Sequence, residues 1–426
     1  MTAKQSSATA GAAAAPDEAP ALADLMPWSA PALRIGRGWV TAPDRAALTA
    51  RWRQFTAAEG PARETLLEPT RARGLHTAVA QLPGHGGATV ELAAETGDCP
   101  DPVRILRGPF DRQWLIPDHR LIDAARPELW RVHDDHQVFA VEQARLPGSS
   151  PDAGPPVVFS ALLPDGRSAD GRRPGRIRPL YRRPGGAEPN VAPGLTAELS
   201  RLLGLGIGSA DFLAWVAAAA VRRTDGTVAV PLPLEPDIWE TGTALGRRLL
   251  WIQTFGSRYG SGPDERPKLP GGRRPYVRAP LHEGRAVPLG SAMFDPQEPG
   301  LAVGDGRVAP VPAGAWEFRT GGVPVVEQWI ARRIAPQATG PLDATGLHGW
   351  RREWTSELLE LITVLALLDE LRPQQRELAD RVARGPALPA SALRKAGVLP
   401  VSRASRLPAS VLDHPEEGPG GQFTLL

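Results

Sequence analysis

The stretch that decides the fold is Gly108-Pro-Phe-Asp-Arg-Gln-Trp-Leu-Ile-Pro-Asp-His-Arg-Leu-Ile-Asp-Ala-Ala-Arg-Pro-Glu-Leu-Trp130. It places the large apolar side chains of Phe110, Trp114, Leu129 and Trp130 among acidic and basic residues. Rings beside charges of both signs are typical of a segment that packs on one side and stays polar on the other. Two interpretations follow. The polar side contacts a partner, or the charges pair inside an ordinary folded segment.

The composition is that of a folded protein with long loops. The 426 residues are 42% hydrophobic, which suffices for one large domain or two medium ones. The formal net charge is only +2 although 49 residues are Lys or Arg, so composition neither requires nor excludes a nucleic-acid partner. Nearly all of these 49 residues are arginine, a bias that a GC-rich genome explains as well as a function does.

The cysteine count and the apolar runs bear on the cellular compartment. Cys99 is the single cysteine, so neither a disulfide framework nor a Cys-based zinc site can form within the chain. The Ala-rich start lacks the continuous apolar core of a signal peptide, and no apolar run approaches the roughly 18 residues of a membrane span. We therefore expect a cytoplasmic protein.

The order of elements predicts an α+β fold with one domain between two tails. Residues 1–22 and 404–426 are expected to be disordered tails, and 23–403 the domain. Within it we expect a strand-rich part over about 28–200 and a helix-rich part over about 201–403. The clearest helix is expected over 354–384, with a break or kink at Pro373, and 259–280 is expected to be a loop. Strands and helices do not alternate regularly, which disfavours a doubly wound sheet.

One short motif could hold a metal ion. His133-Asp-Asp-His136 has two histidines three positions apart, which on a helix would share a face with an Asp as a third ligand. The motif leads into a predicted strand, where positions three apart face opposite sides. Ordinary surface polarity is therefore favoured, and we expect no metal site.

Signals of catalysis are weak. Gly204-Leu-Gly-Ile-Gly208 is similar to a phosphate-binding turn but has neither the dinucleotide spacing nor a P-loop lysine, so a flexible start of a helix is favoured. The sequence contains no Gly-x-Ser-x-Gly elbow, and Cys99 has no evident histidine partner. We expect no catalytic residues and no cofactor, and a hydrolase that uses His133 and His136 is the least favoured interpretation.

The strongest functional signal in the residues themselves is a basic stretch over 171–183. Proline and glycine exclude a regular helix there, so an exposed loop or hairpin is expected. Arginine donates two parallel hydrogen bonds to phosphate or guanine, and a tyrosine can stack on a base. A solvated loop in an arginine-rich chain is the alternative. Its residues are Arg172, Arg173, Arg176, Arg178, Tyr181, Arg182 and Arg183, with no acid between them.

Several motifs carry a resemblance to a known family. Pro109-Phe-Asp-Arg-Gln-Trp114, Asp118 and Arg126-Pro-Glu-Leu-Trp130 resemble the C-terminal specificity, or target-recognition, domain of the type ISP restriction–modification enzymes, here in a stand-alone form. The resemblance covers roughly residues 28–403. Further matching segments follow in the family's order, among them Pro179-Leu-Tyr-Arg182, Asp211-Phe-Leu-Ala-Trp-Val-Ala217, Trp316-Glu-Phe318 and Pro341-Leu-Asp343.

The resemblance implies a non-catalytic protein that recognises a DNA target in a restriction–modification system. Its expected partners are double-stranded DNA and a separate methyltransferase or restriction subunit. The expected DNA contacts are the residues of the basic stretch together with Arg273 and Arg274. The family-signature residues, expected to form the scaffold, are Phe110, Asp111, Arg112, Trp114, Asp118, Arg126 and Trp130.

The sequence also departs from the family. The methyltransferase motif, its glycine-rich cofactor loop and the helicase and nuclease modules are absent from this sequence, and the stretch between Arg222 and Val230 is shorter than is usual. An alternative is therefore a protein-interaction module, or a degenerate remnant, that no longer reads DNA. The apolar stripe from Trp354 to Leu371 would be its docking surface, unless that stripe is a core helix.

Overall fold

The computed structural model describes residues 19–85, 90–144, 153–167, 175–260, 267–268, 274–288, 290–334, 340–346 and 349–410. Helices and small antiparallel sheets are mixed along the chain, so the predicted α+β class is confirmed. Residues 1–18 and 411–426, the greater part of the expected tails, lie outside the described residues. The first described element is helix α1 (Leu22–Leu25), whose two leucines are fully buried.

A first hydrophobic core lies under a three-stranded sheet in the order β2-β4-β3. Helix α2 begins at Arg45, where the Asp44 side chain caps it by accepting a hydrogen bond from the backbone N–H of Ala46 at 2.9 Å. Phe55 on its buried face packs against the rings of Trp39 and Trp52. The elements are β2 (Thr41–Ala42), β3 (Val103–Leu106), β4 (Arg112–Leu115), α2 (Arg45–Ala57), α3 (Gly60–Leu67), α4 (Pro127–Arg131) and a short 3-10 helix (Leu92–Ala94).

A four-stranded antiparallel sheet in the order β1-β7-β5-β6 lies between the two cores. The predicted strand after residue 137 is confirmed as β5. The expectation of an exposed loop or hairpin over 171–183 is wrong for residues 176–179, because β7 is an inner strand of this sheet, whereas residues 181–183 form one strand of a hairpin. The elements are β1 (Ala30–Pro31), β5 (Phe139–Glu142), β6 (Val157–Ser160) and β7 (Arg176–Pro179), followed by the pair β8 (Tyr181–Arg183) and β9 (Ala187–Pro189) around a 3-10 turn (Pro184–Gly186).

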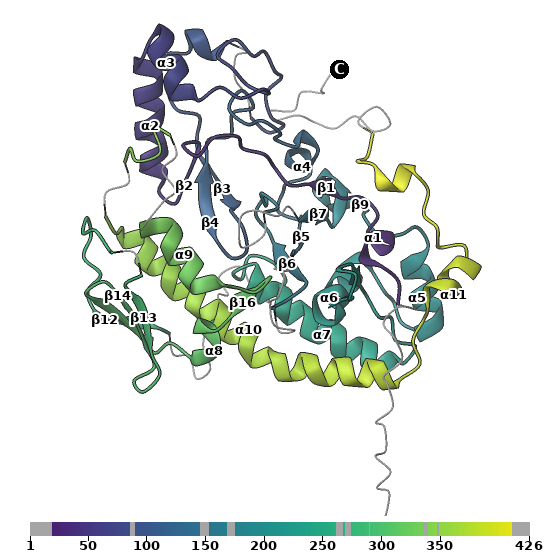
Figure 1. The fold of residues 1–426 in the computed structure, drawn as a ribbon. Coiled ribbons are helices and arrows are strands. Elements are labelled where there is room, and N and C mark those ends of the chain that lie inside the picture. Colours follow the sequence, from purple (N-terminus) through teal and green to yellow (C-terminus); the bar gives the residue numbers. More distant parts are fainter. Residues whose placement is uncertain are drawn as a thin grey trace, which may run out of the picture.

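Helices form most of the second core (Figure 1). Two of them, α6 and α7, cross closely because a Cβ atom at Gly246 would lie 1.7 Å from the carbonyl oxygen of Ala214. The rings of Trp215 and Trp239 stack across the same crossing at 4.9 Å. The helices are α5 (Leu195–Leu203), α6 (Ser209–Ala219), α7 (Pro236–Gln253), α8 (Ala313–Trp316), α9 (Val325–Ile334), α10 (Arg352–Arg384) and α11 (Ala390–Lys395).

The longest helix, α10, runs along one side of the molecule beside α7 and α8 (Figure 1). It continues through Pro373 as one helix of 33 residues, so the expected break there is wrong, whereas its end at Gly385 is confirmed. Proline removes one backbone hydrogen bond, and the buried side chains of Leu371 and Leu378 hold the helix to the core on both sides of it. No helix in the described part of the chain is long and apolar enough to cross a bilayer.

A second four-stranded sheet, in the order β12-β15-β14-β13, lies on the same side of the molecule as α2 and α3 (Figure 1). The expectation of a loop over 259–280 is therefore wrong at β12. The remaining strands form the hairpins β10–β11 and β16–β17, and a 3-10 turn (Ala404–Arg406) follows α11. The strands are β10 (Val221–Arg222), β11 (Val228–Ala229), β12 (Tyr276–Ala279), β13 (Ala292–Asp295), β14 (Gly300–Val303), β15 (Gly306–Ala309), β16 (Arg319–Thr320) and β17 (Val323–Pro324).

Candidate nucleic-acid interface

Asp111 ties the stretch 108–130 to helix α9. Its carboxylate is 1% exposed and accepts hydrogen bonds from the Nη1 of Arg333 at 2.9 Å and the Nη1 of Arg332 at 3.1 Å. Burial alone would raise the pKa of Asp111, but the two guanidinium charges outweigh it and hold that pKa below its usual range. Asp111 is therefore an ionised structural group in the interior.

Two further arginines tie the same hairpin to helix α10. The guanidinium of Arg112 lies 2.5 Å from a carboxylate oxygen of Glu360 and 4.0 Å above the ring of Phe255. On the neighbouring strand, Arg104 pairs with Glu357 and lies 4.5 Å above the ring of Trp114. These contacts use the charges of the hairpin inside the fold, so this stretch is an internal junction.

The other signature residues also have internal contacts. Phe110 and Trp130 are buried, one in each core, and the indole N–H of Trp130 donates to the carbonyl of Ala125 at 2.8 Å. The buried carboxylate of Asp118 accepts from the Nε of Arg120 at 3.0 Å. Arg126, at a positive φ of 59°, donates to the carbonyl of Ala32 at 3.4 Å, so its contact is a backbone oxygen and not an acid.

The structure separates the predicted DNA contacts of the basic stretch into exposed and internal residues. Arg176 is exposed on β7 and donates to the hydroxyl oxygen of Ser29 at 2.8 Å. Its neighbour Arg178 is 4% exposed and donates to Glu142 at 2.7 Å and to the carbonyl of Met26. Burial lowers the pKa of Arg178, and the carboxylate of Glu142 offsets part of that effect.

The last arginines of the stretch hold the C-terminal segment. Arg182 and Arg183 both pair with Glu188, and Arg182 also donates to the carbonyl oxygens of Ala404 and Leu407 at 2.9 and 2.8 Å. Arg183 donates to the carbonyl of Ser410 at 3.0 Å. Of the other predicted DNA contacts, Tyr181 is partly buried against the helical core. Arg172, Arg173 and Arg273 lie outside the described residues.

The histidine motif does not form a metal centre in the described part of the chain. His133 lies near the ring of Phe139, with ring centroids 5.9 Å apart, and burial lowers its pKa. His136 is exposed beside Asp134. Across the described ranges, no three His, Cys, Asp or Glu side chains gather in an arrangement that could hold a metal ion.

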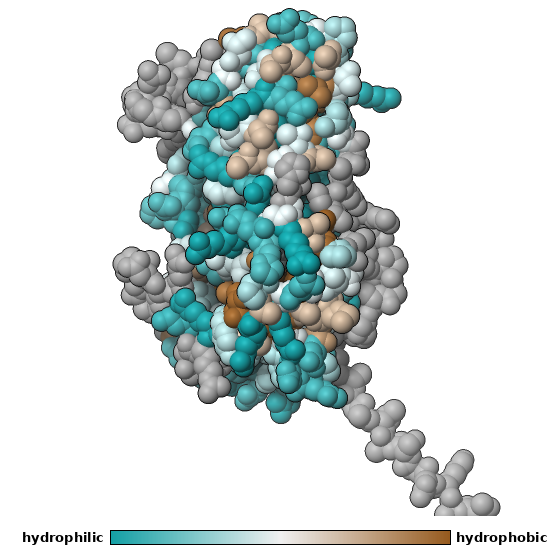
Figure 2. Space-filling view, turned by 90° about the vertical axis from the view of Figure 1, so that its left-hand side faces the viewer, coloured by the Kyte–Doolittle hydropathy of each residue, from teal (hydrophilic) through white to brown (hydrophobic). Residues whose placement is uncertain are grey.

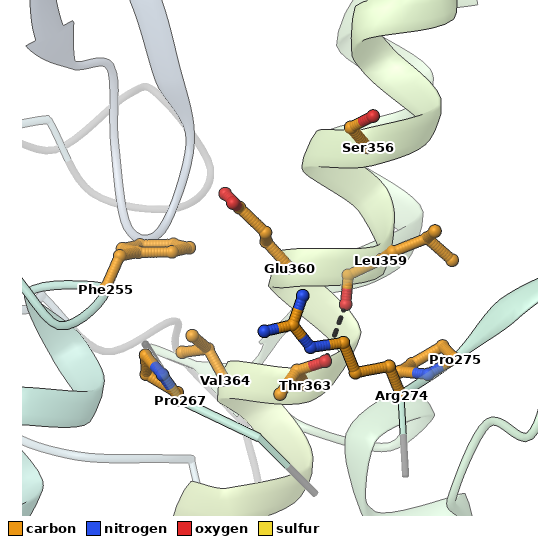
Figure 3. A pocket seen from close by; sticks show the side chains of 9 residues that line it. All are labelled: Phe255, Pro267, Arg274, Pro275, Ser356, Leu359, Glu360, Thr363 and Val364. Atoms are coloured by element: carbon orange, nitrogen blue, oxygen red, sulfur yellow. Dashed lines mark hydrogen bonds between the residues drawn. The ribbon is translucent and has the colours of Figure 1, made fainter. Parts of the chain in front are cut away.

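Arg274 and Arg176 are the two predicted DNA contacts that are exposed among the described residues. Arg274 lies two residues before β12 and, with Pro275, lines a cavity of about 290 Å³ beside α10. Figure 3 shows its guanidinium beside Glu360 and Thr363, with Phe255 on the opposite wall. The hydroxyl of Thr363 is already used, because it donates to the carbonyl of Leu359 at 2.8 Å. Neither an ion pair nor a hydrogen bond of the Arg274 guanidinium is found among the described residues.

Sequence reasoning missed two residues beside Arg274. Tyr276 and Arg278 follow it at alternating positions on β12, and the Arg278 guanidinium lies 5.0 Å from the Tyr276 ring centroid. The period-two pattern was the available signal, but the neighbouring prolines favoured a loop. The face of the molecule that carries this sheet is mostly hydrophilic, with small apolar patches between the polar side chains (Figure 2).

Comparisons with known proteins concern the family and the fold. A family model described as the Type ISP C-terminal specificity domain matches residues 24–361. Among solved structures, a DrdV–DNA complex superposes with a TM-score of 0.53 at 15% identity over 84% of this chain and 36% of that chain. The ATP-dependent Type ISP restriction–modification enzyme LlaBIII bound to DNA gives 0.52 at 12% identity over 85% of this chain and 23% of that chain.

At these identities the structural likeness concerns the fold. The chain spans little more than a third of the DrdV chain and less than a quarter of the LlaBIII chain. No curated protein matches the sequence.

Proposed function

Because the chain belongs to the family of Type ISP C-terminal specificity domains, we propose that it recognises a DNA target for a restriction–modification system. The observation that carries the proposal is the extent of the match, which begins in α1 and ends within α10. Both similar structures contain DNA, which supports double-stranded DNA as the partner. The chain would act in the cytoplasm, where a restriction–modification system meets DNA.

The proposal assigns recognition to this chain and chemistry to other protein modules. LlaBIII is named as an ATP-dependent restriction–modification enzyme, and this chain aligns with less than a quarter of it. Methyl transfer and cleavage would then belong to a methyltransferase or restriction subunit that this chain directs to its site.

The predicted DNA contacts divide by their geometry. Arg176 and Arg274 are exposed and can reach a phosphate, and we retain them as contacts. Arg172, Arg173 and Arg273 stay predictions. We assign Arg178, Arg182 and Arg183 a positioning role, because a phosphate would have to displace the carboxylates and carbonyl oxygens that they already bind.

Docking through the apolar stripe of α10 has less support. Its large side chains are buried in the second core, which leaves that stripe no open surface. The buried residues of the stripe are Trp354, Leu358, Leu361, Ile362, Leu365, Leu368 and Leu371.

Binding to duplex DNA as a function of salt tests the proposal. The purified chain is titrated onto a mixed-sequence duplex, alone and with a methyltransferase that lacks its own recognition region. Each phosphate contact releases counterions, so the logarithm of affinity should fall linearly with the logarithm of salt, by about 0.9 per contact. Absence of duplex binding at low salt in both mixtures contradicts the proposal.

A further inference from the structure

The β12 edge of the β12–β15 sheet carries a basic and aromatic strip, formed by Arg274, Tyr276 and Arg278. Side chains alternate between the faces of a strand, and Tyr276 stands opposite Ala309 on β15, so it lies on the face that carries Arg307 and Met293. The opposite face buries Leu301 and Val308 in the core. Tyr276 is 47% exposed, which is unusual for a large ring in a folded chain.

The arginines of this sheet differ in their partners. Arg307 pairs with Asp295 at 3.1 Å, and the nearby Arg285 pairs with Asp305 at 2.7 Å. No acidic partner of Arg274 or Arg278 is found among the described residues; the Arg278 guanidinium lies instead over the Tyr276 ring. The carboxylates of Asp295 and Asp305 therefore neutralise Arg307 and Arg285, whereas the arginines at the β12 edge keep their positive charge.

The edge position of β12 makes this strip accessible. β12 pairs with β15 on one side only, so its other backbone edge is open in the described part of the sheet. Arg274 and Arg278 are four positions apart, a Cα separation of about 13 Å in an extended chain that the register shift between Val277 and Ala279 shortens slightly. The major groove of B-DNA is about 12 Å wide and admits a two-stranded β-ribbon, so this spacing is comparable with the distance between its two phosphate walls.

We infer that β12 and the two residues before it contact DNA: Arg274 and Arg278 bind phosphates on the two sides of the major groove, and Tyr276 faces the base edges between them. The inference rests on the proposed function and names residues that carry it. The Tyr276 ring offers an apolar surface for a thymine methyl group and a hydroxyl that donates and accepts hydrogen bonds. It also supports the Arg278 guanidinium from below.

Salt-dependent binding of the full chain to a mixed-sequence duplex tests the two arginines. The double variant Arg274→Ala/Arg278→Ala should lower the magnitude of the salt slope by about 1.8, the value for two lost phosphate contacts. The matched control is Arg376→Ala, which removes an exposed arginine of α10 and should leave the slope unchanged. Thermal melting of every variant should match the wild type, because the three side chains are exposed.

Selection from a random duplex pool tests Tyr276. The wild type should enrich a site, and Tyr276→Ala should lose roughly tenfold discrimination at one or two base positions, whereas Tyr276→Phe keeps the ring and most of that discrimination. If the wild type binds duplex and all β12 variants bind as it does, this inference is overturned while the proposed function stands. A β12 that pairs with a protein strand would give that result. If the wild type binds no duplex, both fall.

Discussion

The carboxylate of Asp111 lies 2.9 Å from the Nη1 of Arg333, although 222 residues separate them in the sequence. The pair joins the strand hairpin of the first core to helix α9 of the second. Arg333 also lies 3.1 Å from Glu357 of α10, so one buried guanidinium links three elements. This junction fixes α9 and α10 to the hairpin that carries the family's signature stretch.

The first prediction concerns the strength of this junction. Asp111→Asn should lower the free energy of unfolding by about 3 kcal/mol, because it removes one of the two carboxylates that pair with the buried guanidinium of Arg333. Urea denaturation measures the change. The exposed pair Arg285–Asp305 supplies the control, since Asp305→Asn should cost less than about 1 kcal/mol. Equal costs for the two variants would contradict a structural role of the buried pair.

The second prediction concerns pH. The pKa of Asp111 is lowered in the folded chain, so its contribution to stability is present above the unfolded pKa of about 3.9 and is lost as pH falls through the lower folded pKa. The stability difference between wild type and Asp111→Asn should therefore be constant from pH 7 to about pH 5 and shrink below about pH 4. A difference that grows on acidification would show that the sign is wrong.

The third prediction separates stability from DNA binding at Arg112. Arg112→Ala removes the contacts with Glu360 and Phe255 and should cost about 1–2 kcal/mol, since both contacts are partly exposed. Binding of the folded protein to duplex DNA should stay at the wild-type level. Melting curves and anisotropy titrations of the same sample measure the two effects, and normal melting with lost DNA binding would assign Arg112 to the interface.

The fourth prediction concerns the C-terminal segment held by Arg182 and Arg183. Alanine at both positions removes the donors to the carbonyls of Ala404, Leu407 and Ser410, so limited proteolysis within 401–410 should become faster. The salt slope of DNA binding should change by less than the roughly 0.9 of one phosphate contact. A slope smaller by about 1.8, with unchanged proteolysis, would make both arginines DNA contacts.

The sequence predicted what depends on local order. The motifs of residues 109–130 identified the family because they follow one another along the chain. The α+β class followed from the irregular alternation of short strands and helices.

Contacts between distant segments were beyond such reasoning. Arg178 looked like part of an exposed basic loop, because its partner Glu142 and the neighbouring strands come from other parts of the chain. Pro373 predicted a break or kink from the sequence, whereas α10 continues through it as one helix that packs against the core on both sides. The prolines near β12 favoured a loop in the sequence. The strand forms by pairing with β15, whose residues lie about thirty positions away.

The most direct measurement of the central claim is the sequence preference of the chain for DNA. The purified full-length protein is incubated with a random duplex pool at moderate salt, and the bound fraction is amplified and sequenced over successive rounds. A target-recognition domain should enrich one defined site, and a single mismatch in that site should cost about 1–3 kcal/mol of binding free energy. A bound pool with the same sequence composition as the input would contradict DNA target recognition by this chain.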